Sequence, residues 1–294
     1  MKISLITPCR NAEKYIEQTI QSVLAQEGAD LEYFIQDGAS TDGTVEIIRR
    51  YESRLAGWAS EQDNGQPEAL NKAFQRCTGD IAGFLNADDV LLPNALATVA
   101  RTFAEHPDVD IVYGEVEWID SDGKMFGGHA GQISNLEEIL NIYDVWWAKR
   151  QWVQPEVFLR RSFKERVGLF DSCYDLVFDY DYWVRCFRAG ARVHRIPTKL
   201  VQFRLHPNQK STQAEKASDE IRAIVTREVN GDAKINPRFR RRLQARLSYD
   251  LYQRSDPAKR PGFLRALFKN PSWFWTPEVR SRLRKSFRLS ASAS

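Results

Sequence analysis

The sequence predicts an α/β fold in which a doubly wound, mostly parallel sheet is followed by a mixed half and a helical extension. Short apolar runs alternate with helix-period segments through the first hundred residues. Within each run, apolar residues do not alternate with polar ones, as expected of parallel strands buried on both faces. A chain of 294 residues, 43% hydrophobic and 28% charged, is long enough for one large domain and an appendage.

The first half supplies the parallel strands and the helices between them. Apolar residues at helical spacing, such as Ile16, Ile20 and Val23, predict a helix after the first strand. Pro67 suits the first turn of a later helix, because that turn does not use its backbone N–H groups. The expected strands are residues 3–7, 31–36, 58–62 and 81–85, and the expected helices lie around 16–24, 45–51 and 67–76.

The pattern changes after residue 106. Extended runs at 111–120 and 124–128 flank a Ser-Asp-Gly turn and predict a hairpin. Further strand-like segments at 156–162, 192–197 and 199–206, and a helical one at 179–190, complete this half, after which the chain is helix-like and basic. We therefore expect a domain at 1–212, divided into halves 1–106 and 107–212, and an extension at 213–294.

The net charge of +3 conceals an asymmetry along the chain. Residues 235–294 hold 15 Lys or Arg against 3 Asp or Glu, whereas the preceding residues hold 27 against 36. Apolar and aromatic residues recur between the arginines of this tail, which is typical of segments that contact a membrane surface. The alternative is a basic helix that packs its apolar face on the body. A nucleic-acid partner is not expected, because the body is acidic and no nucleic-acid-binding module is recognisable.

The cysteines and the apolar runs bear on where in the cell the protein resides. Cys9, Cys77, Cys173 and Cys186 lack the spacing of a zinc knuckle or redox pair and are expected to be reduced thiols. The first residues contain no apolar stretch of signal-peptide length, and no segment has the length of a membrane span. We expect a cytoplasmic protein that is peripheral at the inner face of the membrane if the tail binds lipid.

Polar residues follow each of the four strands expected in the first half. The carboxyl ends of parallel strands meet at one edge of a sheet, so these residues are expected to share a cleft. Carboxylates gathered there would repel phosphate unless a divalent cation is bound, which points to a nucleoside diphosphate bridged by Mg²⁺ or Mn²⁺. The charged residues concerned are Arg10, Asp37, Asp42, Asp63, Asp88 and Asp89.

Three common sites are excluded by their missing motifs. The sequence contains no G-x-x-x-x-G-K-[ST] phosphate loop, no G-x-G-x-x-G after the first strand and no G-x-S-x-G serine-hydrolase turn. A nucleotide site without a glycine-rich cradle remains.

Four segments in series resemble family 2 glycosyltransferases of the GT-A fold: TPCRNAEKYIEQTIQSVLAQ, DGASTDGT, DNGQPEALNKA and GDIAGFLNADD. The later GLFDSCYDLVFDYDYWVRCFRAG and FRLHPNQKST resemble the acceptor half of that family, so the resemblance covers roughly residues 1–212. It implies a metal-dependent, inverting transfer of a sugar from a nucleotide-diphosphate donor to a glycan or lipid-linked glycan in surface-polysaccharide synthesis. UDP or dTDP is favoured, since a carboxylate at Asp37 suits the imide N–H of uracil or thymine.

The resemblance also assigns individual residues to the donor site. It implies that Asp37 bonds the base and that Asp63 lies near the ribose. Asp88 matches the metal-binding last position of the family's Asp-X-Asp motif, whose first position is here Asn86, a departure that removes one charge. Asp89 is expected to support the metal ligand or contact the sugar. The other residues expected at the nucleotide or its phosphates are Pro8, Arg10, Ser40 and His206, with Arg204 beside the last.

The resemblance places the catalytic base at the start of the second-half helix. Asp179 is the candidate, and Asp181, two residues on, faces another direction along the helix. Phe178 precedes Asp179 and is expected to desolvate its carboxylate, raising the pKa toward the useful range of a base.

Structural roles compete with these assignments. Asp37 and Asp42 are ordinary turn formers, Asp88 and Asp89 could cap a helix beginning near Pro93, and Asp179 could cap its own helix. For the whole chain, the alternatives are a non-catalytic nucleotide-sugar-binding or scaffold protein of the same fold and a sugar nucleotidyltransferase. The latter is expected to carry a basic, Gly-rich loop after the first strand, which this sequence lacks.

Overall fold

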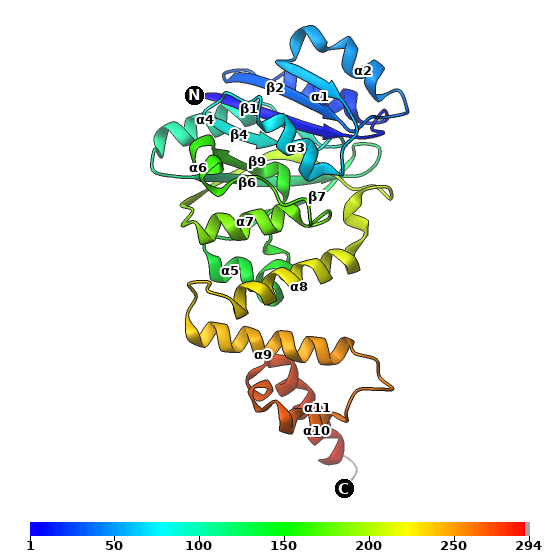
Figure 1. The fold of residues 1–294 in the computed structure, drawn as a ribbon, viewed down its shortest axis with the longest axis vertical. Coiled ribbons are helices and arrows are strands. Elements are labelled where there is room, and N and C mark those ends of the chain that lie inside the picture. Colours follow the sequence, from blue (N-terminus) through cyan, green and yellow to red (C-terminus); the bar gives the residue numbers. More distant parts are fainter. Residues whose placement is uncertain (292–294) are drawn as a thin grey trace. The chain divides into compact units, whose positions relative to one another are not determined.

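The computed structural model describes residues 1–291, with side chains described for all of these except Ser211 and residues 286–291. The chain divides into two compact units, residues 1–220 and 221–294, which are described separately below (Figure 1).

The first half of the larger unit alternates strands with helices, as expected. Buried residues Ile16, Ile20 and Val23 share one face of the first helix, and Pro67 lies in the first turn of the third. The elements are β1 (Lys2–Cys9), α1 (Ile16–Leu24), β2 (Asp30–Asp37), α2 (Thr44–Arg50), η1 (Glu52–Arg54), β3 (Gly57–Ser60), α3 (Gln66–Phe74), β4 (Ile81–Phe84), β5 (Val90–Leu91) and α4 (Ala95–Glu105).

The second half adds strands of both directions and short helices. Its elements are β6 (Ile111–Ile119), β7 (Met125–His129), α5 (Leu136–Leu140), η2 (Ile142–Arg150), η3 (Gln154–Glu156), β8 (Val157–Arg160), α6 (Arg161–Val167), α7 (Phe178–Arg188), β9 (Val193–Arg204) and η4 (Lys210–Thr212). The expected hairpin is β6 with β7. The two strand-like segments at 192–197 and 199–206 form the single strand β9, because the pairing of β6 with β9 shifts register near Pro197. A proline, which lacks the N–H, is tolerated at such an irregularity.

Within residues 1–291, the nine strands belong to one sheet in the order β3-β2-β1-β4-β8-β6-β9-β5, with β7 paired to β6. Strands β1 to β4 are mutually parallel, and β8 runs antiparallel between β4 and β6. Strand β9 is parallel to β6, so the sheet is mostly parallel with a mixed second half, as expected. The register sets Cys9 beside Asp37 and Asp37 beside Ser60, so the carboxyl ends of β1, β2 and β3 are level.

The smaller unit is helical. It contains most of α8 (Ala214–Asn230), followed by α9 (Pro237–Arg254), α10 (Phe263–Lys269), η5 (Pro271–Trp275) and α11 (Pro277–Ala291). A small apolar core joins the last four, with Tyr249, Leu267, Trp273 and Val279 at its centre. Over residues 1–291, none of the helices combines the length and the apolar character that crossing a bilayer requires.

Candidate active site at the carboxyl edge of the sheet

The loops after β1 and β2 are tied together by hydrogen bonds. The Gly38 N–H donates to the carbonyl of Cys9 at 2.8 Å, and the Asn11 N–H donates to the Ser40 hydroxyl at 2.7 Å. The Asn11 side chain accepts from the Thr41 N–H at 2.9 Å. Pro8 is buried at the end of β1, and Arg10 next to it is exposed. Two of the expected polar strand ends therefore form one structural unit.

Asp37 is completely buried and its carboxylate has a full set of donors. One oxygen accepts from the Ser40 N–H at 2.9 Å and the Ser60 hydroxyl at 2.6 Å. The other accepts from the Ser40 hydroxyl and, at 3.5 Å, the Cys9 thiol. A carboxylate has about four lone-pair positions, and all are used. A base that bonds to Asp37 would have to displace one of these donors.

Asp63 lies against the loop that follows β2. A Cβ atom built on Gly38 would lie only 2.6 Å from Oδ2 of Asp63, so no larger residue fits at position 38 without displacing that carboxylate. The other oxygen of Asp63 accepts from the Gly65 N–H at 2.9 Å. The structure thus brings the third polar strand end to the same edge as the first two.

The adjacent carboxylates Asp88 and Asp89 have different surroundings. Asp89 is completely buried and accepts from the Arg204 N–H at 2.9 Å and from the Asn86 amide at 2.9 Å. Burial and the neighbouring Asp88 charge raise the pKa of Asp89 well above its usual value. Asp88 is 28% exposed, and its Oδ2 lies 2.9 Å from Nε2 of His206. Neither residue caps the following helix, which begins at Ala95 after Asn94.

Arg204 joins the end of β9 to the segment that follows β4. Its buried guanidinium donates to the Asp88 carbonyl at 2.9 Å, the Asp120 carbonyl at 3.1 Å and the Gln18 side chain at 2.6 Å. The guanidinium also lies 4.6 Å from the centre of the Tyr15 ring, which contacts the His206 ring at 5.1 Å. Arg204 therefore fixes the backbone of Asp88 and the side of the site that carries His206.

Replacing Arg204 with Met is expected to lower the free energy of unfolding by about 3 kcal/mol, because the buried guanidinium is lost and the carbonyls of Asp88 and Asp120 and the Gln18 side chain lose their donor at once. Lys should rescue little, since a single ammonium group cannot reproduce a planar fork. Urea unfolding measures both effects. The control is Arg192→Met, whose side chain is 59% exposed and should change stability by less than about 1 kcal/mol. An Arg204→Met protein as stable as the control would refute this role.

The side chains present fit a divalent cation that takes most of its ligands from elsewhere. Among residues 1–291, no three His, Cys, Asp or Glu side chains gather closely enough to enclose a metal. Asp88 and His206 nevertheless present one carboxylate and one imidazole at a partly exposed position. Mg²⁺ and Mn²⁺ sites at nucleotides commonly use one or two protein ligands and complete their shell with phosphate oxygens and water. Both ends of the Asn86 side-chain amide already make hydrogen bonds: its oxygen accepts from Gln66 at 2.8 Å, and its nitrogen donates to Asp89 at 2.9 Å.

Asp179 lies in the first turn of α7 and is partly buried. Its Oδ1 accepts from the adjacent Tyr180 N–H at 2.8 Å, and the N-cap residue of the helix is Val177, so Asp179 is not the cap. Desolvation raises the pKa of Asp179 to about 6 against the opposing effect of backbone hydrogen bonds. This is the direction expected from its apolar flank. Asp181, by contrast, is buried in an ion pair with Arg185 at 2.8 Å.

Aromatic packing connects the start of α7 to the end of β4. Phe178 packs on Phe170 at a ring distance of 5.3 Å, and Phe170 packs on Phe84, the last residue of β4, at 5.2 Å. The preceding loop also approaches the third polar strand end, because a Cβ atom on Gly65 would lie 3.0 Å from Oδ1 of Asp175. The candidate base therefore comes from an element that packs on the same edge of the sheet.

Three residues of this edge carried no individual prediction: Tyr15, Gln18 and Gln66. All lie in the segments that resemble the family, but a tyrosine or glutamine has no chemistry that marks it in a sequence. Their place in the segments that connect a strand end to the next helix, or in the first turn of that helix, is the only signal that could have singled them out. Their partners His206, Arg204 and Asn86 are far away in sequence.

Residues 4–164 match the family model described as glycosyl transferase family 2. The match covers more than half of the chain, which therefore belongs to this family and is a glycosyltransferase. The alternatives of a sugar nucleotidyltransferase and a non-catalytic scaffold are set aside.

Two similar proteins with curated names come from bacteria. "O-antigen biosynthesis protein RfbC" of Myxococcus xanthus is 36% identical over 126 residues, which is 41% of this chain but only 10% of that protein. "PGL/p-HBAD biosynthesis glycosyltransferase" of Mycobacterium tuberculosis is 29% identical over 196 residues, covering 65% of this chain and 72% of that one.

Solved structures with the same fold include Staphylococcus aureus TarS and an archaeal mannosyltransferase. TarS 1–349 in complex with UDP has a TM-score of 0.63 at 19% identity, over 87% of this chain and 73% of that one. PcManGT of Pyrobaculum calidifontis, in complex with GDP-Man and Mn²⁺, has a TM-score of 0.59 at 19% identity, over 99% and 85%. These similarities confirm the GT-A fold expected from the sequence.

Proposed function

We propose that this glycosyltransferase moves a sugar, with inversion and with the aid of a divalent cation, from a nucleotide-diphosphate donor to a glycan or lipid-linked glycan acceptor of a surface polysaccharide. The observation that carries the proposal is the edge of the sheet that holds the partly exposed Asp88–His206 pair and the loops of Asp37 and Asp63. The complexes of TarS with UDP and of PcManGT with GDP-Man and Mn²⁺ support a nucleotide donor and a metal. The names of the relatives support a cell-surface glycan.

The donor would occupy the loops at this edge. Asp37 and Asp63 would face the base and the ribose, and the base would replace one of the donors that now surround Asp37. The uracil or thymine preference follows from this carboxylate, so UDP or dTDP sugars are favoured. The remaining nucleotide and phosphate contacts would come from Pro8, Arg10, Ser40, Asn86, Asp89 and His206.

Asp88, with His206 beside it, would hold Mn²⁺ or Mg²⁺, which when bound supplies positive charge against the leaving diphosphate. Asp179 would accept the proton of the acceptor hydroxyl as that oxygen bonds to the anomeric carbon of the sugar. The bond from this carbon to the diphosphate oxygen breaks in the same step, and its electron pair leaves with the diphosphate. Because the acceptor attacks opposite the leaving group, the anomeric configuration inverts, and Asp179 is needed only as a base.

The domain at 1–212 would carry this chemistry, with donor binding in residues 1–106 and acceptor recognition in 107–212. A lipid-linked acceptor would place the enzyme at the inner face of the cytoplasmic membrane. The basic extension 213–294 would then contact the bilayer.

A donor screen tests the proposal. The protein is incubated with UDP-, dTDP- and GDP-sugars in Mn²⁺ or EDTA, and release of the nucleoside diphosphate is measured. Slow release from a UDP- or dTDP-sugar that EDTA abolishes and added Mn²⁺ restores is the expected result. Release that is indifferent to EDTA would refute the metal requirement, and release from GDP-sugars alone would refute the role given to Asp37.

A further inference from the structure

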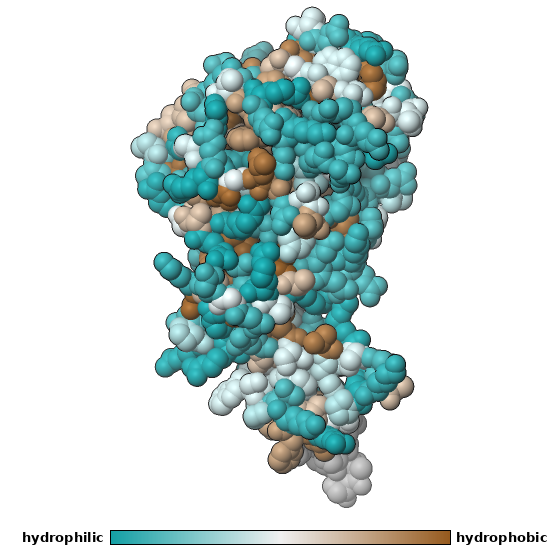
Figure 2. Space-filling model, in the orientation of Figure 1, coloured by the Kyte–Doolittle hydropathy of each residue, from teal (hydrophilic) through white to brown (hydrophobic). Residues whose placement is uncertain are grey.

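The C-terminal unit exposes large apolar side chains that its own core does not use. Leu267 and Trp273 are buried in that core, whereas Phe268 is 91% exposed and Trp275 is 71% exposed. Leu264, one helical turn before Phe268 on α10, is 68% exposed. Figure 2 shows hydrophobic residues, in brown, at the surface of the C-terminal part of the chain. Exposed Phe, Leu and Trp on short consecutive elements are unusual for a surface that faces only water.

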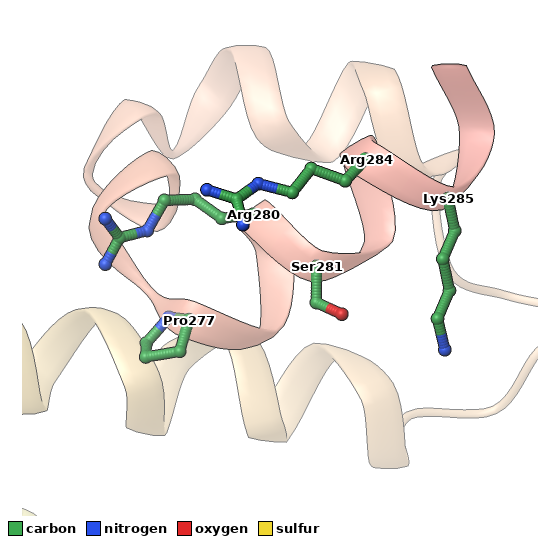
Figure 3. A pocket seen from close by; sticks show the side chains of 5 residues that line it. All are labelled: Pro277, Arg280, Ser281, Arg284 and Lys285. Carbon is green, nitrogen blue, oxygen red and sulfur yellow. The ribbon is translucent and has the colours of Figure 1, made fainter. Parts of the chain in front are cut away.

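The helix that follows these residues in the sequence, α11, lines a basic pocket. It has a volume of about 380 Å³ and is lined by one side of α11: Pro277, Arg280, Ser281, Arg284 and Lys285 (Figure 3). In Figure 3 the Arg284 side chain points back toward Arg280. Within the part of the chain that the structure describes, no acidic side chain pairs with Arg280, Arg284 or Lys285. The three cations therefore leave their positive charge available to an anion from outside the chain.

The pocket and the apolar residues are physically connected. Arg280 donates from Nη2 to the backbone carbonyl of Trp275 at 3.3 Å, which ties the basic face of α11 to the residue that carries the exposed indole. The segment η5, which ends at Trp275, packs against both α10 and α11. Arg282 of α11 also lies over the Phe263 ring of α10, with 4.1 Å between the guanidinium carbon and the ring centre.

We propose that this surface binds an anionic lipid bilayer, with a lipid phosphate in the pocket of Arg280, Arg284 and Lys285 and with Trp275 and Phe268 inserted at the membrane interface. Aromatic side chains favour the headgroup region, and each basic residue near an anionic leaflet adds to binding. The proposal rests on the membrane location proposed above for the enzyme. It adds to that location a lipid class and the residues that recognise it.

A nucleic acid is the other polyanion that such a pocket could attract. Leu264 and Phe268 argue for lipid, because an exposed aliphatic–aromatic pair on one helix face gains most from an apolar phase. The excess of acidic residues before position 235 would also repel a long polyanion, whereas a bilayer needs to meet only the tail.

Co-sedimentation of the full chain with vesicles tests the proposal. One set of vesicles is phosphatidylcholine alone, and the other is equal parts phosphatidylcholine and phosphatidylglycerol. Binding to the anionic vesicles only is expected. The triple change Arg280→Gln, Arg284→Gln and Lys285→Gln should weaken it about a hundredfold, taking roughly fivefold per basic residue. Trp275→Ser with Phe268→Ser should weaken it at least about tenfold.

The matched control removes the same charge elsewhere in the unit. Arg238, Arg241 and Lys259 are exposed and lie outside the pocket, and their change to Gln should cost far less binding than the pocket triple. An equal loss in both triples would refute the site, as would absence of binding to the anionic vesicles. Tighter binding to tRNA than to vesicles through the same three residues would replace the lipid with nucleic acid. The vesicle experiment contains no sugar donor, so a negative result would overturn the lipid site without changing the result of the donor screen.

Discussion

Asp179→Asn is expected to lower sugar transfer about a thousandfold while leaving donor binding unchanged, which is the effect of removing a general base. The substitution keeps the shape of the side chain and the acceptor for the Tyr180 N–H. Transfer to a supplied acceptor is measured alongside UDP affinity. Asp122→Asn, in the exposed turn between β6 and β7, is the control and should behave as wild type. Normal transfer by Asp179→Asn would remove this residue from the mechanism.

The raised pKa of Asp179 adds a pH dependence to the same prediction. A base acts when it is ionised, so transfer by the wild type should rise as pH increases through about 6 and level off above it. Folding raises the pKa of this carboxyl from 3.8 to about 6, so the folded protein holds the proton more tightly than the unfolded chain does. The stability that this proton contributes is fully present below pH 3.8 and is lost as the pH rises through about 6. At pH 7.5 the Asn variant should therefore be more stable than wild type, by about 1–3 kcal/mol.

Loss of transfer together with a gain in stability distinguishes a catalytic role of Asp179 from a structural one. A residue that only supported the helix would lose activity and stability together, whereas a desolvated base is held at a cost to stability. Urea unfolding at pH 7.5 and at pH 5 measures the difference between the two proteins. A stabilisation that shrinks at the lower pH agrees with the raised pKa, and a loss of stability at both values contradicts it.

Much of the sheet could be predicted because its strands are continuous apolar runs. Residues 81–85 illustrate this: β4 spans Ile81–Phe84, and the polar residues after it reach the edge where a parallel sheet binds ligands. The path of β9 through Pro197 could not be predicted, because it depends on a register shift in a strand that pairs from elsewhere in the chain. The two-residue strand β5 is too short to leave a periodic signal.

The residue types of the site could be predicted, but their partners could not. Asp88 and Asp89 are adjacent in sequence and look equivalent. The Asp88 carboxylate nevertheless lies beside the His206 ring, whereas the buried Asp89 carboxylate accepts from the backbone N–H of Arg204. Similarly, Asp37 stands out as an acid after a strand, but nothing in the sequence indicates that Ser60, on another strand, already bonds to it. Such pairings are set by strand order and register, which local patterns do not encode.

The measurement that tests the central claim most directly is isothermal titration of UDP, dTDP and GDP into wild type and Asp88→Ala, each with and without Mn²⁺. We predict that UDP or dTDP binds wild type at least about tenfold more tightly with Mn²⁺, or ~1.4 kcal/mol. The Asp88→Ala protein should lose this gain and keep the weaker, metal-independent binding. An equal Mn²⁺ effect in both proteins, or no binding of any nucleotide to wild type, would contradict a metal-assisted donor site at the carboxyl edge of the sheet.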